Sequence, residues 1–139
     1  MIYALDTNIV IHYLREEANV RRHFKNAVEN GAGIVIPRVV HYELKRGFAV
    51  QSAPAKERLY DGLVGEIGLC DIVDMDSNCW ERAEQIYAEL YQKHLTVDEL
   101  DILIASFCLE NNCTLVTNNV KDFENIDGLT IEDWFTKTA

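Results

Sequence analysis

The sequence has little proline, few cations and no long apolar run. It holds two Pro, and its 13 Lys and Arg stand against 23 Asp and Glu, giving a formal net charge of −10 in 139 residues. Its apolar runs fall far short of the ~20 residues of a membrane-spanning helix. The first apolar segment ends at Asp6, too early for a signal peptide. We therefore expect a cytoplasmic protein without membrane contact.

Paired cysteines are also missing. The four cysteines form no Cys-x-x-Cys pair and have no histidine at zinc-finger spacing, which argues against a zinc finger or a redox pair. Cys70 and Cys108 lie in apolar stretches, where we expect them to pack as small hydrophobic side chains. With 48% hydrophobic and 26% charged residues, the composition is that of a globular protein. The length predicts a single domain over 1–139 with its own core.

The few cations are distributed unevenly along the chain. Residues 1–60 hold nine Lys and Arg and six Asp and Glu, a net charge of +3. Residues 61–139 hold four and seventeen, a net charge of −13. A nucleic-acid-binding protein normally presents a basic surface. The total charge argues against that class, whereas the first half alone does not.

Short apolar segments alternate with segments of helical periodicity. Strands are predicted at residues 2–5, 33–36, 70–73, 114–117 and 129–131. Helices are predicted at residues 9–15, 19–29, 37–48, 54–63, 80–90 and 100–109, the last behind a capping box over 96–99. This alternation predicts an α/β fold with a central parallel sheet of four to five short strands, flanked by helices on both faces.

Polar residues follow two of these strands, and in parallel sheets ligands bind outside the carboxyl ends of the strands. Asp6 follows the first strand, and Asn119 and Asp122 follow the fourth. Each has a structural alternative. Asp6 suits a helix N-cap, although Thr7 or Asn8 could cap the helix and leave Asp6 free. Asn119 suits a turn, and Asp122 a helix cap or a solvated loop.

Three further acids lie in or beside apolar helical stretches. Asp101 interrupts the apolar run 100–105, where an ionised carboxylate is costly unless it is paired or binds a metal. Asp98 lies three residues earlier, on the same helical face. Glu43 borders an apolar stripe and needs either a metal or a partner, which could be Lys45, Arg46 or a residue on another element. Acids gathered from several elements repel one another, and Mg²⁺ or Mn²⁺, which prefers oxygen ligands, would relieve this repulsion.

Several segments match the motifs of one family in order and spacing. The matching segments are residues 5–8, Glu43 with Leu44 and Gly47, 101–105, 115–119, 122–123 and 128–134. They span residues 5–134, and only together are they specific. On these motifs the chain resembles PIN-domain ribonucleases, in particular the VapC-type toxins of bacterial type II toxin–antitoxin pairs.

The resemblance implies a PIN fold and an Mg²⁺- or Mn²⁺-dependent endoribonuclease that hydrolyses RNA phosphodiester bonds, with tRNA or ribosomal RNA as substrate. It also implies a VapB-type antitoxin that blocks the site, and a homodimer that assembles further with this antitoxin. Asp6, Glu43 and Asp101 correspond to the three core acids of the family, which are catalytic and bind the metal. Many relatives have Asp at the position of Asn119, so Asp122 could supply the missing charge.

Other residues take supporting roles in this interpretation. Thr7 or Asn8 would hold Asp6 by a hydrogen bond, and Asp98, Asn119 and Asp122 would support the metal site. The cations predicted to contact the RNA backbone are Arg15, Arg38, Lys45 and Arg46.

Two other interpretations remain open from the sequence. A phosphatase with Asp6 as covalent nucleophile would need a second acid two residues later, where this chain has Asn8. A non-catalytic module, either PIN-like and binding RNA or protein or receiver-like with Lys121 as its late lysine, would not need the metal. Binding of Mn²⁺ that depends on Asp101 separates the enzyme from the module.

Overall fold

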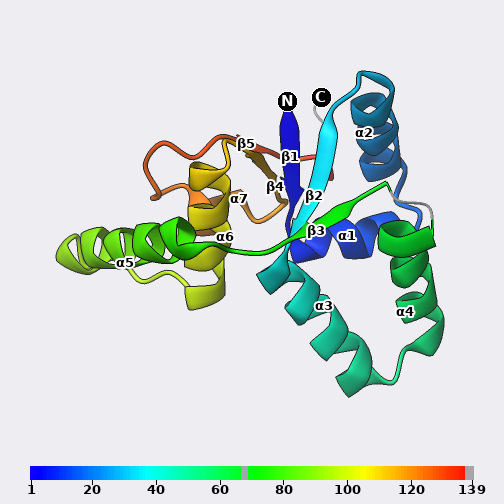
Figure 1. Ribbon diagram of the computed structural model, residues 1–139, viewed down its shortest axis with the longest axis horizontal. Coiled ribbons are helices and arrows are strands. Elements are labelled where there is room, and N and C mark those ends of the chain that lie inside the picture. Colours follow the sequence, from blue (N-terminus) through cyan, green and yellow to red (C-terminus); the bar gives the residue numbers. More distant parts are fainter. Residues whose placement is uncertain (67–68, 137–139) are drawn as a thin grey trace.

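The computed structural model describes residues 1–66 and 69–136, which form a five-stranded parallel sheet with helices around it (Figure 1). The strand order is β3-β2-β1-β4-β5. The strands are β1 (Ile2–Leu5), β2 (Gly33–Pro37), β3 (Asp71–Val73), β4 (Thr114–Val116) and β5 (Ile131–Glu132). The predicted α/β fold with a short-stranded parallel sheet is confirmed.

The helices occupy the segments that the periodicity predicts, with shifted ends. They are α1 (Thr7–Leu14), α2 (Ala18–Glu29), α3 (Arg38–Gln51), α4 (Pro54–Asp61), a π-helical turn η1 (Gly62–Glu66), α5 (Ser77–Gln92), α6 (Glu99–Glu110) and the short α7 (Val120–Phe123). Figure 1 shows α5, α6 and α7 grouped on the left and α1, α2 and α4 on the right. In the described part of the chain, no helix combines the length and apolarity needed to cross a membrane.

All strands are parallel, but the side of the sheet to which the chain adds new strands changes once, when it passes from β3 to β4. The chain moves from β1 outward to β2 and β3, then returns to β4 beside β1 and continues to β5. Because crossover connections between parallel strands are right-handed, the helices before and after this return cover opposite faces of the sheet. A ligand-binding crevice is expected outside the carboxyl ends of the strands at such a reversal. The fold therefore predicts a site where β1 and β4 end.

Two of the helix starts that differ from the prediction depend on an aspartate at the N-cap. The capping box over 96–99 is wrong, because Asp98 is the N-cap of α6, and its Oδ1 accepts the N–H of Leu100 at 2.9 Å. The prediction of a first helix from residue 9 is also wrong. Asp6 itself caps α1 by accepting the N–H of Thr7 at 2.8 Å, so the helix begins at Thr7. In both cases an aspartate takes the cap, where the positive end of the helix dipole favours its charge.

The core holds the cysteines and the aromatic side chain near the C-terminus. Cys70 and Cys108 are buried, as predicted. Trp134 is 2% exposed, packs edge-on against Tyr3 and donates its indole N–H to Glu132 at 3.1 Å. These contacts anchor the last strand to the sheet.

Candidate active site

Asp6 lies at the end of β1 with both carboxylate oxygens held in place. Its side chain is 5% exposed. Oδ1 accepts the Thr7 N–H at 2.8 Å, and Oδ2 accepts the hydroxyl of Thr117, the residue after β4, at 2.7 Å. The Thr117 hydroxyl oxygen in turn accepts the Asn119 N–H at 3.0 Å. These bonds fix the carboxylate at the reversal point of the sheet, across the ends of its two central strands.

Thr117 was not predicted as a site residue. Its position directly after the apolar strand β4 was the available signal, because a buried hydroxyl needs a hydrogen-bond partner and Thr117 is fully buried. Of the two alternatives for Asp6, the structure shows the N-cap. Thr7 also holds Asp6 by a hydrogen bond, as the resemblance implies. The hydrogen bond to Asp6 comes from the backbone of Thr7, whose hydroxyl donates instead to Glu43 Oε1 at 3.1 Å.

Glu43 extends this arrangement onto α3, the helix that follows β2. Its side chain is half-buried, and α3 packs against both α1 and α6. Burial raises the pKa of the Glu43 carboxyl, the Thr7 hydrogen bond lowers it, Asp6 raises it, and Arg46 lowers it. Glu43 therefore has the partner that its apolar surroundings require, and it lies within electrostatic range of Asp6.

Asp101 carries the strongest sign of crowded negative charge. Burial, followed by the charges of Asp6, Asp98, Asp122 and Glu43, raises the pKa of Asp101 to about 7. Every cause of this shift acts in the same direction, and no cation offsets it within the described part of the chain. The structure thus brings together five of the acids predicted from the sequence, which we call the acid cluster.

The supporting residues lie around this cluster in different ways. Asp98 is exposed and caps α6. Asp122 is exposed on α7, and its charge raises the pKa of both Asp6 and Asp101. Asn119 precedes α7 without capping it through its side chain. Its neighbour Asn118 has a buried Oδ1 without a hydrogen-bond partner among the residues described. Asn8 lies in the first turn of α1.

The donor chemistry of the acid cluster fits a divalent cation, although the carboxylates do not form a closed cage. Within residues 1–66 and 69–136, no three His, Cys, Asp or Glu side chains converge as a metal-binding group. Mg²⁺ usually keeps several waters and takes only one or two carboxylates, so an open set of acids suits it. Uncompensated carboxylates such as Asp101 would gain from a bound cation.

The cations predicted for RNA differ in their surroundings. Arg38 pairs with Asp74 at 2.6 Å, and Lys45 pairs with Glu57 at 2.8 Å and Asp61 at 2.7 Å, so intramolecular partners offset their charges. Arg46 lies near enough to Glu43 to lower its pKa. Arg15 is exposed and lines a small cavity together with Thr7 and Glu43. Arg15 and Arg46 are therefore the two predicted cations next to the acids.

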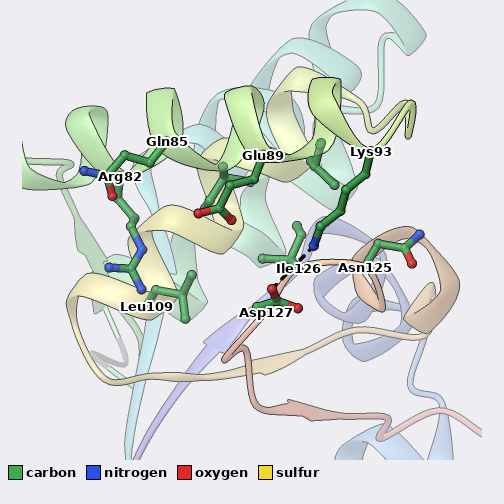
Figure 2. Close-up of a pocket in the computed structure, with 10 residues that line it drawn as sticks. Arg82, Gln85, Glu89, Lys93, Leu109, Asn125, Ile126 and Asp127 are labelled. Carbon is green, nitrogen blue, oxygen red and sulfur yellow. Dashed lines mark ion pairs between the residues drawn. The ribbon is translucent and has the colours of Figure 1, made fainter.

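A separate cavity of about 270 Å³ lies between α5 and the loop before β5 (Figure 2). We call it the α5 cavity. Figure 2 shows Lys93 reaching from α5 toward this loop, where it pairs with Asp127 at 3.5 Å, whereas Arg82 points toward Leu109 of α6. Arg82 pairs with Glu110 at 3.6 Å. None of the five acids of the acid cluster lines the cavity, and its cations have acidic partners.

Comparison with known proteins agrees with this geometry. The sequence model of the PIN domain matches residues 3–129. Ribonuclease VapC2 of Rickettsia felis is 33% identical over 134 residues, which cover 96% of this chain and 98% of the relative. The tRNA(fMet)-specific endonuclease VapC of Shigella flexneri is 32% identical over 133 residues, covering 95% of this chain and 97% of the relative.

Solved structures show the same likeness. The structure of VapBC2 from Rickettsia felis bound to a DNA fragment from their promoter has a chain with TM-score 0.83 and 32% identity, covering 96% of this chain and 99% of that one. DNA-bound VapBC from Salmonella typhimurium gives TM-score 0.81 and 30% identity, with coverage of 96% and 98%. These matches do not favour a receiver-like module or a phosphatase. The chain belongs to the PIN-domain family and, within it, to the VapC-type ribonucleases.

Proposed function

We propose that this chain is a divalent-metal-dependent endoribonuclease toxin whose active site is the acid cluster. The observation that best supports this proposal is the pKa of Asp101. Burial and four neighbouring acids raise it to about 7, and no cation compensates them. Strongly perturbed acids gathered at one place are typical of functional sites. Their position outside the ends of β1 and β4 is where this fold class binds ligands.

Asp6, Glu43 and Asp101 would hold Mg²⁺ or Mn²⁺, one or two of them directly and the rest through the water molecules that such an ion keeps. When bound, such an ion activates water and neutralises the charge that develops on the phosphodiester. A carboxylate oxygen has two lone pairs, so Asp6 can accept its two hydrogen bonds and still bind a cation. Thr117 and Thr7 hold Asp6 and Glu43 in orientation. Asp98, Asn119 and Asp122 supply further oxygen atoms at the edge of the site.

The substrate proposed for the first test is initiator tRNA, with ribosomal RNA as the second. The Shigella flexneri relative is named a tRNA(fMet)-specific endonuclease, and both classes of RNA are found in the cytoplasm, where we place this protein. Arg15 and Arg46 lie next to the acids and are the best placed of the predicted RNA contacts. Since the acids themselves repel phosphate, binding of RNA should depend on the metal.

The proposed partner is a VapB-type antitoxin. The similar solved structures are VapBC complexes. A basic antitoxin segment carrying an Arg would complement the acid cluster without a metal. We further propose a single domain over 1–139 that forms a homodimer and assembles further with the antitoxin.

The test is cleavage of initiator tRNA by the purified protein with Mg²⁺, with Mn²⁺ and with EDTA. We expect defined cleavage ends with either metal and none with EDTA. Asp101→Asn should abolish cleavage, whereas Asp127→Asn, which changes an exposed aspartate at the α5 cavity, should leave it intact. Full cleavage in EDTA or by Asp101→Asn would contradict the proposal. Expression without antitoxin should slow growth only when Asp101 is present.

A further inference from the structure

A small cavity is lined in part by Glu43 of the acid cluster. Its volume is about 120 Å³, and Thr7, which donates a hydrogen bond to Glu43, also lines it. The residues that line it come from α1 and its C-cap, from α3 and from α4, and these three helices contact one another. Its walls are apolar, from Ile11, Leu14 and Phe48. We call it the α1–α3 pocket.

Gly47 lines this pocket from the middle of α3. A glycine inside a helix lowers its stability relative to alanine, so its presence needs a reason. A Cβ built on Gly47 would meet no atom within 4 Å. The glycine is therefore not needed for packing within this chain. Because Gly47 has no side chain, the space beside it in the α1–α3 pocket stays open.

Two cations line the pocket. Arg15, the C-cap of α1, and Lys56, in the first turn of α4, both line it and are both exposed. Within residues 1–66 and 69–136 neither takes part in an ion pair. Lys45, also on α3, does not line the pocket and has two acidic partners. The lining of the pocket thus combines one acid, apolar side chains and two uncompensated cations.

We propose that the α1–α3 pocket binds the sugar–phosphate of the RNA nucleotide next to the cleaved bond. Arg15 and Lys56 contact its phosphate, and Ile11, Leu14 and Phe48 pack against its ribose. The volume of about 120 Å³ lies well below the roughly 300–1,000 Å³ of pockets for whole small molecules. It therefore suits part of a longer strand that continues from the acid cluster. This inference rests on the proposed function and names a substrate subsite of the same active site.

The first test measures cleavage and binding of an initiator tRNA transcript. Arg15→Ala and Lys56→Ala should each lower kcat/KM about 10-fold, mainly through KM, while Arg15→Lys and Lys56→Arg keep most of it. Binding is measured in the cleavage-deficient Asp101→Asn background at several salt concentrations. Each alanine variant should reduce the slope of log affinity against log salt by about 0.7–0.9, the value of one phosphate contact. The matched control is Arg22→Ala, an exposed cation on α2, which should change neither quantity.

The second test fills the pocket without changing charge. Gly47→Leu should lower kcat/KM at least 10-fold while its thermal midpoint stays at or above that of the wild type, since the side chain enters open space. Gly47→Ala should raise the thermal midpoint and keep activity within about threefold, because its methyl group occupies little of the pocket.

The outcomes separate this inference from the proposed function. If the wild type cleaves neither tRNA nor ribosomal RNA with any divalent metal, both fail. If it cleaves while the Arg15, Lys56 and Gly47→Leu variants behave like Arg22→Ala, only the pocket proposal is overturned. It is equally overturned if these variants cleave normally and only escape inhibition by the antitoxin, because the pocket would then serve a protein partner.

Discussion

The acid cluster and the α5 cavity both gather charged side chains, yet they differ in how charge is compensated. At the α5 cavity, Lys93 pairs with Asp127 and Arg82 with Glu110. In the acid cluster, four acids and burial raise the pKa of Asp101 to about 7, with no cation offsetting them. A folded chain tolerates uncompensated like charge only at a cost in stability. The acid cluster is therefore the region for which we propose a metal and a substrate, although the α5 cavity is larger than the α1–α3 pocket beside the cluster.

The largest expected difference between the two regions is in catalysis. Asp6→Asn should lower the rate of RNA cleavage at least about 1,000-fold, because it removes a charged metal ligand at the reaction centre. Glu89→Gln, an equivalent amide substitution at the α5 cavity, should stay within about twofold of the wild type. The measurement is kcat/KM with Mn²⁺ on initiator tRNA. Equal losses in both variants would remove the functional distinction between the regions.

A smaller loss is expected when an acid keeps its charge and loses its orientation. Thr117→Val removes the hydroxyl that donates to Asp6 Oδ2 at 2.7 Å. It should cost about 1–3 kcal/mol of unfolding free energy, since a buried carboxylate oxygen loses its partner. Cleavage should fall about 10- to 100-fold through misplacement of Asp6, and Thr117→Ser should restore both. Urea unfolding measures the stability, and kcat/KM measures the cleavage. If Thr117→Val matched the wild type in both, the hydrogen bond from Thr117 would not be needed to hold Asp6 in place.

The pH dependence of stability should differ between the regions when no metal is bound. The pKa of Asp101 is raised from 3.8 to about 7 in the folded protein, so the folded state holds a proton that the unfolded state has released. Stability contributed by this group is thus lost as pH rises from about 4 to about 7.

Asp101→Asn in EDTA should consequently be more stable than the wild type above pH 7. We expect about 2 kcal/mol, less than the whole shift implies, because the half-exposed carboxylate is screened by solvent. The difference should shrink toward pH 4. Thermal midpoints at pH 4, 5.5, 7 and 8 measure this difference, and Asp127→Asn at the α5 cavity is the matched control. A difference that does not vary with pH would contradict the assigned cause.

The smallest effect is expected from breaking an ion pair of the α5 cavity. Lys93 and Asp127 have side chains 52% and 81% exposed, and exposed pairs contribute about 0–1 kcal/mol. Lys93→Met should therefore shift the thermal midpoint by less than about 3 °C and leave RNA cleavage unchanged. A larger destabilisation would show that the α5 cavity depends on its paired charges more than its exposure suggests.

Much of the acid cluster could be predicted from sequence because its signals are local. Asp6 follows an apolar strand segment, and Asp101 interrupts an apolar helix. A charged group in such surroundings is visible without any knowledge of the chain path. Thr117 was missed because a threonine at the end of a strand is common and its partner lies 111 residues away.

The helix starts and the state of the cations were less accessible. Thr96 and Asp98 both suit an N-cap, and which one is used depends on how the preceding loop approaches the helix. Arg38 pairs with Asp74 across 36 residues, and Lys45 with Asp61 across 16. Lys56 gains its place beside Arg15 only because α4 packs against α1. No local pattern distinguishes the paired cations from the unpaired ones.

The sequence by itself determined the alternation of strands and helices, the acids at their ends and the family motifs. These follow from periodicity and from the cost of burying charge, which act over a few residues. Only the tertiary structure decided that β4 returns beside β1, so that Thr117 reaches Asp6 and five acids from four parts of the chain share one site. It also decided which of the scarce cations remain uncompensated, because ion pairs form between segments that meet only after the chain has folded.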